Sequence, residues 1–483
     1  MSIFFQVFFF LLLTTRFFSE TLGILPKGAD LIDLIVIPFF IPVMVALFAM
    51  RVQKSGQIDN KLHNSLVRLV LFYLSISLIS FIANYQRVNL PPAVLFLFGM
   101  LEGPILFILL NRLIKDKKKF GKTMSRFINF IVIVEFCAVI FVNIPMFVES
   151  GNPDVMSGTF GNNSYQFSVF LIIIGGYFLG KLLTTSNFTY KIYGIIIQIF
   201  VLGTFILLQY RSAVPAFFLA YGIVFIMLYG KKFIRLAALG TILALMIYGG
   251  FYFVSSQDYK LRYEDLLDVA SKPSDAVNYG KVIAFKNTAI MFTEHPQMIV
   301  FGSGPGNFIS RANYTFTIEL NQNITKGVGF IIRKFFGNKE FSSDVFKTHI
   351  EKLYYMDALF GSVQLNNPNS SLLAPLAETG FLGFICFGGI YLILIKKSKE
   401  YFQFSRKNAD KHLLPLATAL FMGVLYLIFL APLDNYLEIG RITLFIWFLF
   451  WVVNSLVEYK KFEIKNQIMN LYLQKEKFLI NQQ

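Results

Sequence analysis

Arg211 is the first residue whose type and position could perform chemistry. It opens a long apolar stretch in the string Tyr210-Arg211-Ser212. A guanidinium group can hold a phosphate or diphosphate through two parallel hydrogen bonds. An arginine at the end of a membrane helix can equally extend its charge to the lipid–water interface. The sequence therefore leaves Arg211 with an anion-binding and a structural interpretation.

A polar segment of residues 255–368 carries a second group of candidates. Its glycine-rich part, which we call the glycine-rich string, has the sequence Glu294-His295-Pro296-Gln297-Met298-Ile299-Val300-Phe301-Gly302-Ser303-Gly304-Pro305-Gly306-Asn307-Phe308. No Gly-Lys-Ser/Thr follows, so a phosphate-binding loop is not predicted, and Gly304-Pro305-Gly306 indicates a turn. The segment holds two of the four histidines, His295 and His349. Without cysteines or suitably spaced carboxylates they do not suggest a metal ion, and we expect neither metal nor cofactor.

Acidic residues within apolar stretches form a third group. Asn369-Ser370-Ser371 runs directly into such a stretch, and Glu378 follows about two turns later. Ser370 or Asn369 could cap a helix there, which leaves Glu378 unexplained. Glu102 and Glu135 also lie in apolar stretches. Each could serve a proton relay or a hydrogen bond between helices, and the missing basic partner favours the hydrogen bond.

The elements that must position these residues are membrane helices. The chain has 483 residues, of which 55% are hydrophobic and only 15% charged. A soluble protein could not bury so much apolar surface, and a spanning helix needs about 20 mostly apolar residues. About twelve such segments are predicted, over residues 4–24, 30–50, 65–84, 92–113, 127–148, 164–184, 189–209, 212–230, 233–254, 370–395, 412–432 and 436–457.

Basic residues orient these predicted helices. The linkers after the even-numbered segments are rich in Lys and Arg, whereas residues 149–163 contain none. Because cytoplasmic loops carry the excess of basic residues, both termini are expected in the cytoplasm and residues 255–368 outside it. The predicted organisation is nine helices in 1–254, a large extracytoplasmic loop in 255–368, three helices in 369–457, and a basic cytoplasmic tail in 458–483. A solvated tail is favoured over an amphipathic helix on the membrane surface.

The net charge of +16 does not indicate nucleic-acid binding. Residues 255–368 contain 12 Lys/Arg and 11 Asp/Glu, so the largest polar segment is nearly neutral. The basic excess lies in short linkers such as 115–119 and 396–399, as membrane topology requires. The two cysteines, Cys137 and Cys386, lie in apolar runs and offer no disulfide framework.

The motifs together resemble the O-antigen ligase/polymerase superfamily of bacterial envelope glycan enzymes. The segments that carry the resemblance are Tyr210-Arg211-Ser212, Gly280-Lys281-Val282-Ile283-Ala284-Phe285-Lys286-Asn287, the glycine-rich string, and Asn369-Ser370-Ser371-Leu372 with Ala377-Glu378-Thr379-Gly380-Phe381-Leu382-Gly383. They cover about residues 210–390. The resemblance implies an all-α membrane protein of the glycosyltransferase C type in the bacterial cytoplasmic membrane. It also implies chemistry on undecaprenyl-diphosphate-linked sugars at the outer face, without metal or cofactor.

The resemblance also assigns roles to residues. It implies that Arg211 holds the donor diphosphate, that Lys281 stands where members often have arginine, and that Glu378 is the family's acidic residue. Asn369 stands where members usually have histidine; it cannot exchange protons near neutral pH, so the base is either dispensable or supplied by His349 or His295. The predicted catalytic residues are Arg211, Asn369, Glu378 and His349, and the predicted substrate-binding residues are Lys281, His295, Gly304, Asn307, Ser370 and Tyr210.

The expected function is polymerisation of undecaprenyl-diphosphate-linked repeat units of an O-antigen, capsule or exopolysaccharide. An O-antigen ligase that transfers finished glycan to lipid A-core is the close alternative, and a transporter or flippase for lipid-linked sugars that uses Glu102 and Glu135 is a second. The expected partners are the lipid-linked donor and acceptor, the bilayer, and flippase and chain-length regulator proteins, with no nucleic acid.

Overall fold

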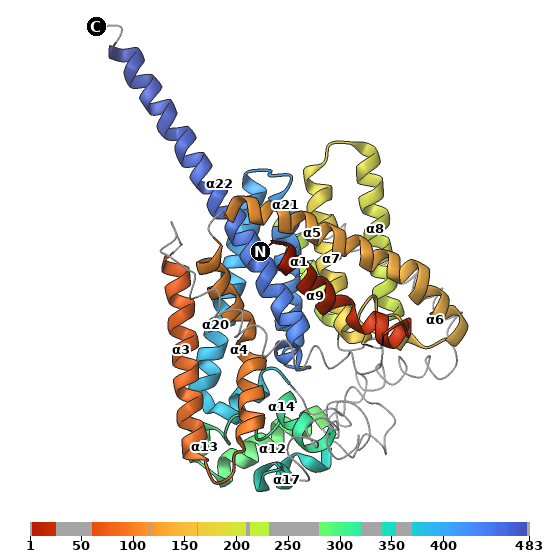
Figure 1. The fold of residues 1–483 in the computed structure, drawn as a ribbon, viewed down its shortest axis with the longest axis vertical. Coiled ribbons are helices and arrows are strands. Elements are labelled where there is room, and N and C mark those ends of the chain that lie inside the picture. The colour runs from red at the N-terminus through yellow and green to blue at the C-terminus, as the bar shows by residue number, and fades with distance from the viewer. Residues whose placement is uncertain are drawn as a thin grey trace.

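The computed structural model describes residues 2–25, 60–114, 117–161, 163–208, 213–230, 280–319, 341–353 and 370–480. Within these ranges all regular structure is helical (Figure 1). The α-helices are α1 Ser2–Arg16, α3 Asn60–Ala83, α4 Leu90–Leu113, α5 Lys117–Ala138, α6 Ile144–Ser150, α7 Ser164–Thr184, α8 Phe188–Leu207, α9 Ala213–Tyr229, α12 Gly280–Glu294, α13 Gln297–Phe301, α14 Arg311–Tyr314, α17 Asp344–His349, α20 Leu373–Lys407, α21 Leu413–Leu430 and α22 Gly440–Ile480. Short π-helical turns occur at η1 Phe17–Thr21, η4 Val139–Asn143 and η8 Thr315–Glu319, and short 3₁₀ turns at η5 Pro153–Val155 and η9 Tyr436–Glu438.

Eight described helices are long and apolar enough to cross a membrane. They are Lys61–Ala83, Leu90–Asn111, Gly121–Ser150, Ser164–Thr184, Phe188–Leu207, Leu373–Lys407, Leu413–Leu430 and Gly440–Gln474. They match eight of the twelve predicted segments, which confirms an all-α polytopic membrane protein. Two further segments correspond to shorter apolar helices, α1 with 15 residues and α9 with 17. The predicted segments 30–50 and 233–254 lie outside the described residues.

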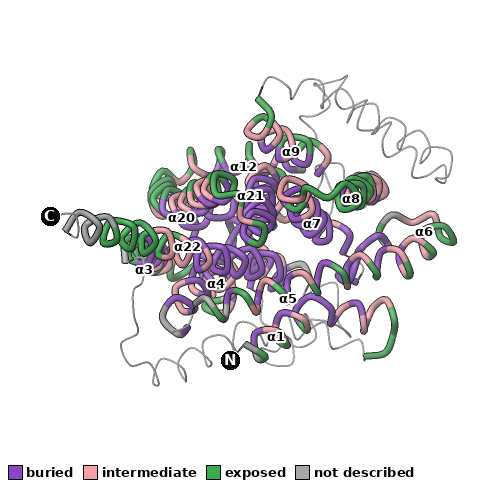
Figure 2. Tube along the Cα trace, turned by 90° about the horizontal axis from the view of Figure 1, so that it is seen from above, coloured by how far each residue is buried: buried purple, intermediate pink, exposed green. Residues whose placement is uncertain are grey.

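Helix α21 forms the centre of the bundle and is buried along nearly its whole length (Figure 2). It packs against α7 through small residues. A Cβ on Gly176 would lie 2.9 Å from the Cα of Ala419, and a Cβ on Gly180 would lie 2.5 Å from the Cα of Pro415. Such close approach of backbones is the usual way in which membrane helices associate, since lipid offers no hydrophobic driving force between them. The exposed apolar residues of α8 face outward, as contact with lipid requires.

Glu102 and Glu135 form hydrogen bonds across the bundle. The hydroxyl of Thr443 on α22 donates to Glu102 Oε1 on α4 at 3.0 Å. The backbone N–H of Thr159 donates to Glu135 Oε2 at 2.9 Å. Both carboxyls are buried. These contacts agree with the hydrogen-bond interpretation that the sequence favours.

The two ends of the bundle differ. At one end lie the described basic stretches at the start of α5, at the end of α7 and the start of α8, and at the end of α20 (Figure 1). Arg406 at the end of α20 donates to the carbonyls of Met227 and Leu228 on α9, at 2.6 and 3.0 Å. We call this the Lys-rich end. At the opposite end α12, α13, α14 and α17, the described helices of the polar segment, pack beside the ends of α3 and α20 (Figure 1). We call this the α12–α17 end. Helix α22 continues without a break past the predicted boundary at residue 458 and projects from the bundle at the Lys-rich end.

Candidate functional site

Two glycines bring the glycine-rich string against the start of α20. Gly302 and Gly380 both have a φ of +71°, and Gly380 interrupts the helical backbone of α20. A Cβ on Gly380 would lie 2.2 Å from the carbonyl oxygen of Val300. The two segments then pair through their backbones, with the Ser303 N–H donating to Ala377 O at 2.8 Å and the Gly304 N–H to Glu378 O at 3.0 Å. Only glycine fits both positions, because each combines left-handed φ with backbone contact.

Glu378 holds the string in place with both of its carboxylate oxygens. Its Oε2 accepts the N–H of Gly306 at 2.5 Å. Its Oε1 accepts three further N–H groups, those of Phe308, Ile309 and Ser310, at 3.0, 2.8 and 2.7 Å. The side chain is fully buried. Glu378 therefore fixes the segment directly before Arg311, the first residue of α14, and it does not line the pocket described below.

Gly304 and Asn307 are buried in the same junction. A Cβ on Gly304 would meet Val88 Cγ2 at 2.1 Å, so this turn sits against the corner between α3 and α4. The Asn307 side-chain amide donates to Ser303 O at 2.9 Å, and Ser343 Oγ donates to Asn307 O at 3.1 Å. The positive φ of Gly304 and Gly306 confirms the predicted turn. The structure gives these two predicted substrate-binding residues packing contacts within the protein.

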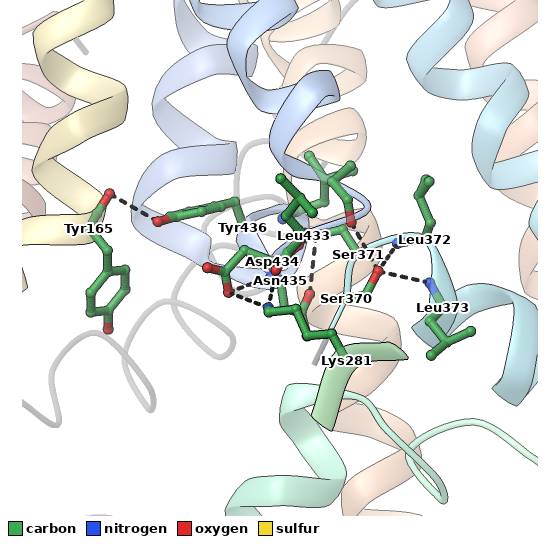
Figure 3. Close-up of polar contacts among 12 residues, drawn as sticks. Tyr165, Lys281, Ser370, Ser371, Leu372, Leu373, Leu433, Asp434, Asn435 and Tyr436 are labelled. Atoms are coloured by element: carbon green, nitrogen blue, oxygen red, sulfur yellow. Dashed lines mark hydrogen bonds and ion pairs between the residues drawn. The ribbon is translucent and has the colours of Figure 1, made fainter. Parts of the chain in front are cut away.

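Lys281 and Ser370 both contact the loop between α21 and α22 (Figure 3). Lys281 Nζ donates to the carbonyl of Leu433 and lies 3.9 Å from the carboxylate of Asp434. Ser370 Oγ donates to Ala431 O at 3.0 Å and accepts the N–H of Leu373 at 3.4 Å. The loop is thus held from two sides just before η9. The N-cap of α20 is Leu372, which makes no side-chain capping hydrogen bond, so Ser370 contacts the turn before the helix and is not the predicted N-cap.

The two histidines lie on the described helices of the polar segment. His349 ends α17, and its Nε2 is 3.3 Å from Glu294 Oε2 at the end of α12. His295 lies in the turn between α12 and α13 and is half-buried. Neither lines the pocket described next. Three other predicted site residues, Tyr210, Arg211 and Asn369, lie outside the described residues.

Charged side chains from five segments meet at a pocket where α4, α14 and the start of α22 come together. The cavity has a volume of about 70 Å³, which is room for a few water molecules or a compact anionic group. We call it the arginine pocket. The charged and polar residues that line it are Arg16, Arg311, Arg441, Glu102, Glu438, Gln166 and Thr315.

Local structure sets the position of each of these charges. Arg311 starts α14, and its backbone N–H donates to Glu438 Oε2 at 2.7 Å. Glu438 ends η9, and Arg441 lies in the first turn of α22 with only 3% of its surface exposed. Arg16 ends α1 and pairs with Glu20 at 3.9 Å. Glycines permit the close approach: a Cβ on Gly440 would lie 2.7 Å from Glu102 Oε1, and one on Gly99 3.3 Å from Glu438 O.

Three guanidinium groups and two carboxyl groups line the arginine pocket, and Glu20 pairs with one of the three, Arg16. Burial raises the pKa of Glu438 to about 8, and the carboxylate of Glu378 adds to the rise, whereas Asn435, the Arg311 N–H and the Arg311 charge oppose it. Glu438 is thus mostly protonated at neutral pH, which shifts the balance toward positive charge. Arginine is the residue best suited to bind phosphate groups in a buried site. The pocket can therefore bind a compact anion beside a carboxyl group.

The sequence carries a signal for only one of the three pocket arginines. Arg441 lies near the start of the predicted segment 436–457, at its non-basic end, where the topology rule disfavours cations, as it does for Arg211. Arg16 lies within the predicted segment 4–24, and Arg311 lies in the polar segment 255–368, far from any predicted spanning segment. Which of these arginines meet cannot be read from the sequence, because Arg16 and Arg441 are separated by most of the chain.

Among the described residues no cluster of three or more His, Cys, Asp or Glu side chains could hold a metal ion. No protein-family model matches the chain, and comparison with curated proteins finds no match.

Proposed function

We propose that the chain is a glycosyltransferase that polymerises undecaprenyl-diphosphate-linked oligosaccharide repeat units at the outer face of the bacterial cytoplasmic membrane. The observation that carries the proposal is the arginine pocket, which is lined by Arg311 and Ala312 of α14 at the α12–α17 end of the bundle. The Lys-rich end is the opposite one, and by the positive-inside rule this supports an extracytoplasmic position of the pocket.

A lipid diphosphate fits the chemistry of this location. Its apolar tail requires a membrane, and the chain offers a bundle with exposed apolar helix faces. Its diphosphate carries several negative charges in a compact group, which suits three arginines around a small cavity. As the sugar is transferred, charge develops on the leaving diphosphate, and preorganised cations stabilise that charge most effectively in a site with little water.

The residues predicted from sequence take supporting roles in this proposal. Glu378 fixes the segment that delivers Arg311 to the pocket, through four backbone hydrogen bonds. Lys281 and Ser370 hold the loop that leads to Glu438. We infer that Glu378 and Lys281 position pocket residues rather than contact the substrate. Arg211 remains a candidate ligand for the diphosphate, and both termini are proposed to be cytoplasmic.

The alternatives differ in how well the structure supports them. A ligase that moves finished glycan to lipid A-core would use the same donor, and the pocket does not distinguish it from a polymerase. A proton-coupled flippase is less well supported, because Glu102 and Glu135 are engaged by Thr443 and Thr159. Flippase and chain-length regulator proteins remain proposed partners of the polymerase.

Deletion of the gene followed by electrophoresis of surface glycans tests the proposal. A polymerase predicts glycan with a single repeat unit, and a ligase predicts undecorated core with accumulated lipid-linked polymer. Complementation with Arg441→Gln should reproduce the deletion, whereas Arg87→Gln should restore the wild-type pattern. Arg87 is an exposed arginine beside the same end of the bundle. An unchanged glycan pattern in the deletion strain would contradict both activities.

A further inference from the structure

Glu438 has one carboxyl oxygen engaged by the fold and one without a hydrogen-bond partner. Its Oε2 accepts the Arg311 N–H at 2.7 Å. Its Oε1 has no partner within hydrogen-bond geometry among the described residues, although only 7% of the residue is exposed. The side-chain amide of Asn435 is a neighbouring donor that lowers the pKa of the Glu438 carboxyl, and its nitrogen also lacks a partner within hydrogen-bond geometry among these residues. A buried carboxyl oxygen normally finds a partner, because leaving it without one is costly. An unpartnered buried oxygen on a residue that lines a pocket therefore points to a ligand that supplies a donor.

A second side chain that lines the pocket, that of Gln166 on α7, also has a buried oxygen, Oε1, without a hydrogen-bond partner among the described residues. Both side chains line the arginine pocket. A phosphate group offers acceptors and would bind the arginines, so these two oxygens require a different ligand group. A sugar hydroxyl, which donates a proton, has the required chemistry.

We propose that Glu438 is the base that takes the proton from the acceptor hydroxyl, with Gln166 as a second contact of the acceptor sugar. The inference rests on the proposed glycosyltransferase function and deepens it. The acceptor oxygen forms a bond to the anomeric carbon of the donor while the bond from that carbon to the diphosphate oxygen breaks. The electron pair of the broken bond leaves with the diphosphate toward the arginines, and the acceptor proton passes to Glu438 Oε1, from which water removes it.

The surroundings of Glu438 are compatible with this role. The groups around it are Arg311 from α14, Arg441 from α22, Arg16 from α1, Glu102 from α4, Glu378 from α20, Tyr73 from α3 and Asn435 from the preceding loop. Burial raises its pKa to about 8, and a base is most effective when its pKa lies near the operating pH. The base must be ionised to accept a proton. The transfer rate should therefore rise with pH up to about 8 and then level.

Glu438 could instead act only by holding Arg311, and Glu438→Gln separates the two roles. The glutamine oxygen can still accept the Arg311 N–H, but an amide cannot take a proton. The assay uses purified full-length protein in lipid nanodiscs with a synthetic undecaprenyl-diphosphate oligosaccharide as donor and acceptor. Loss of the base should lower kcat by about 100-fold to 10,000-fold, with KM for the donor unchanged. Glu149→Gln, at an exposed residue, is the matched control and should behave as wild type.

Each outcome bears on a separate claim. A Glu438→Gln enzyme with wild-type kcat, or one that loses only donor affinity, overturns the inference and leaves the proposed function standing. Absence of transfer by the wild-type protein overturns the proposed function and the inference with it. Because the variant could fail to fold, the wild-type pH profile gives an independent test. A profile that is flat between pH 6 and pH 9 overturns the base role without any substitution.

Discussion

Substitution of Glu378 by glutamine should destabilise the junction between the glycine-rich string and α20. The amide oxygen can keep the three N–H contacts of Oε1, but the amide NH₂ would face the Gly306 N–H, donor to donor. A lost hydrogen bond to a charged group costs about 1.5–3 kcal/mol. The three remaining bonds weaken as the acceptor loses its charge, and relief of the buried charge offsets part of that weakening. The expected loss is about 2–3 kcal/mol.

Replacement of Glu378 by alanine should cost more. It would leave four buried N–H groups without an acceptor, each at about 1–3 kcal/mol, for a total of at least about 4 kcal/mol. Thermal unfolding of the purified protein, followed by size-exclusion chromatography in detergent, should rank the melting temperatures as wild type, then glutamine, then alanine. Glu149→Gln is the control and should melt with wild type. A Glu378→Gln protein as stable as wild type would refute the role of this carboxylate in fixing the string.

Three further predictions rest on contacts of the same junction and pocket. Gly380→Ala should lower the melting temperature and the yield of folded protein more than Gly388→Ala on the same helix. A Cβ at position 380 would meet Val300 O at 2.2 Å, whereas a Cβ at position 388 would have no neighbour within 4 Å among the described residues. Equal yields and melting temperatures would contradict the backbone contact. Lys281→Met should reduce transfer several-fold without abolishing it, because the loop before Glu438 loses the contacts that Lys281 makes with Leu433 and Asp434. A complete loss of transfer in a folded protein would indicate direct substrate contact instead. The pKa of Glu438 is raised to about 8, so between about pH 4.5 and pH 8 the folded state keeps a proton that the unfolded state has released. The free energy of unfolding should therefore fall as the pH rises through this range, by at most about 1.4 kcal/mol per pH unit. Glu438→Gln should reduce that slope in chemical unfolding experiments, and an unchanged slope would contradict the buried position of the carboxyl.

Much of the fold could be predicted because hydropathy alone determines which segments span a membrane. Eight predicted spans coincide with described apolar helices, and the basic linkers gather at one end. Local rules also predicted the turn at Gly304. These features depend on residues close together in the chain, so the sequence shows them directly. The predicted N-cap at Ser370 or Asn369 was wrong, because the N-cap of α20 is Leu372.

The candidate site was harder to predict from the sequence, because it depends on contacts between segments that are distant in the chain. The sequence placed Glu378 near a membrane edge without an explanation, and its role depends on four N–H groups about 70 residues earlier in the chain. The arginine pocket joins Arg16, Arg311 and Arg441, which lie on α1, α14 and α22. No local pattern links these helices. Glu438 lies at the start of the predicted span 436–457 and gives no signal in the sequence, because an acid at the end of a span is usually solvated.

The central claim is that the arginine pocket binds the diphosphate of a lipid carrier. The most direct measurement is binding of radiolabelled undecaprenyl diphosphate to the purified protein in nanodiscs, with wild type, Arg441→Lys and Arg87→Lys compared at one ionic strength. Lysine keeps the charge but loses the two-pronged hydrogen bonding of arginine. We predict saturable binding by wild type and Arg87→Lys, and at least about 10-fold weaker binding by Arg441→Lys, a loss of about 1.4 kcal/mol. Equal binding by all three proteins, or none by wild type, would contradict the claim.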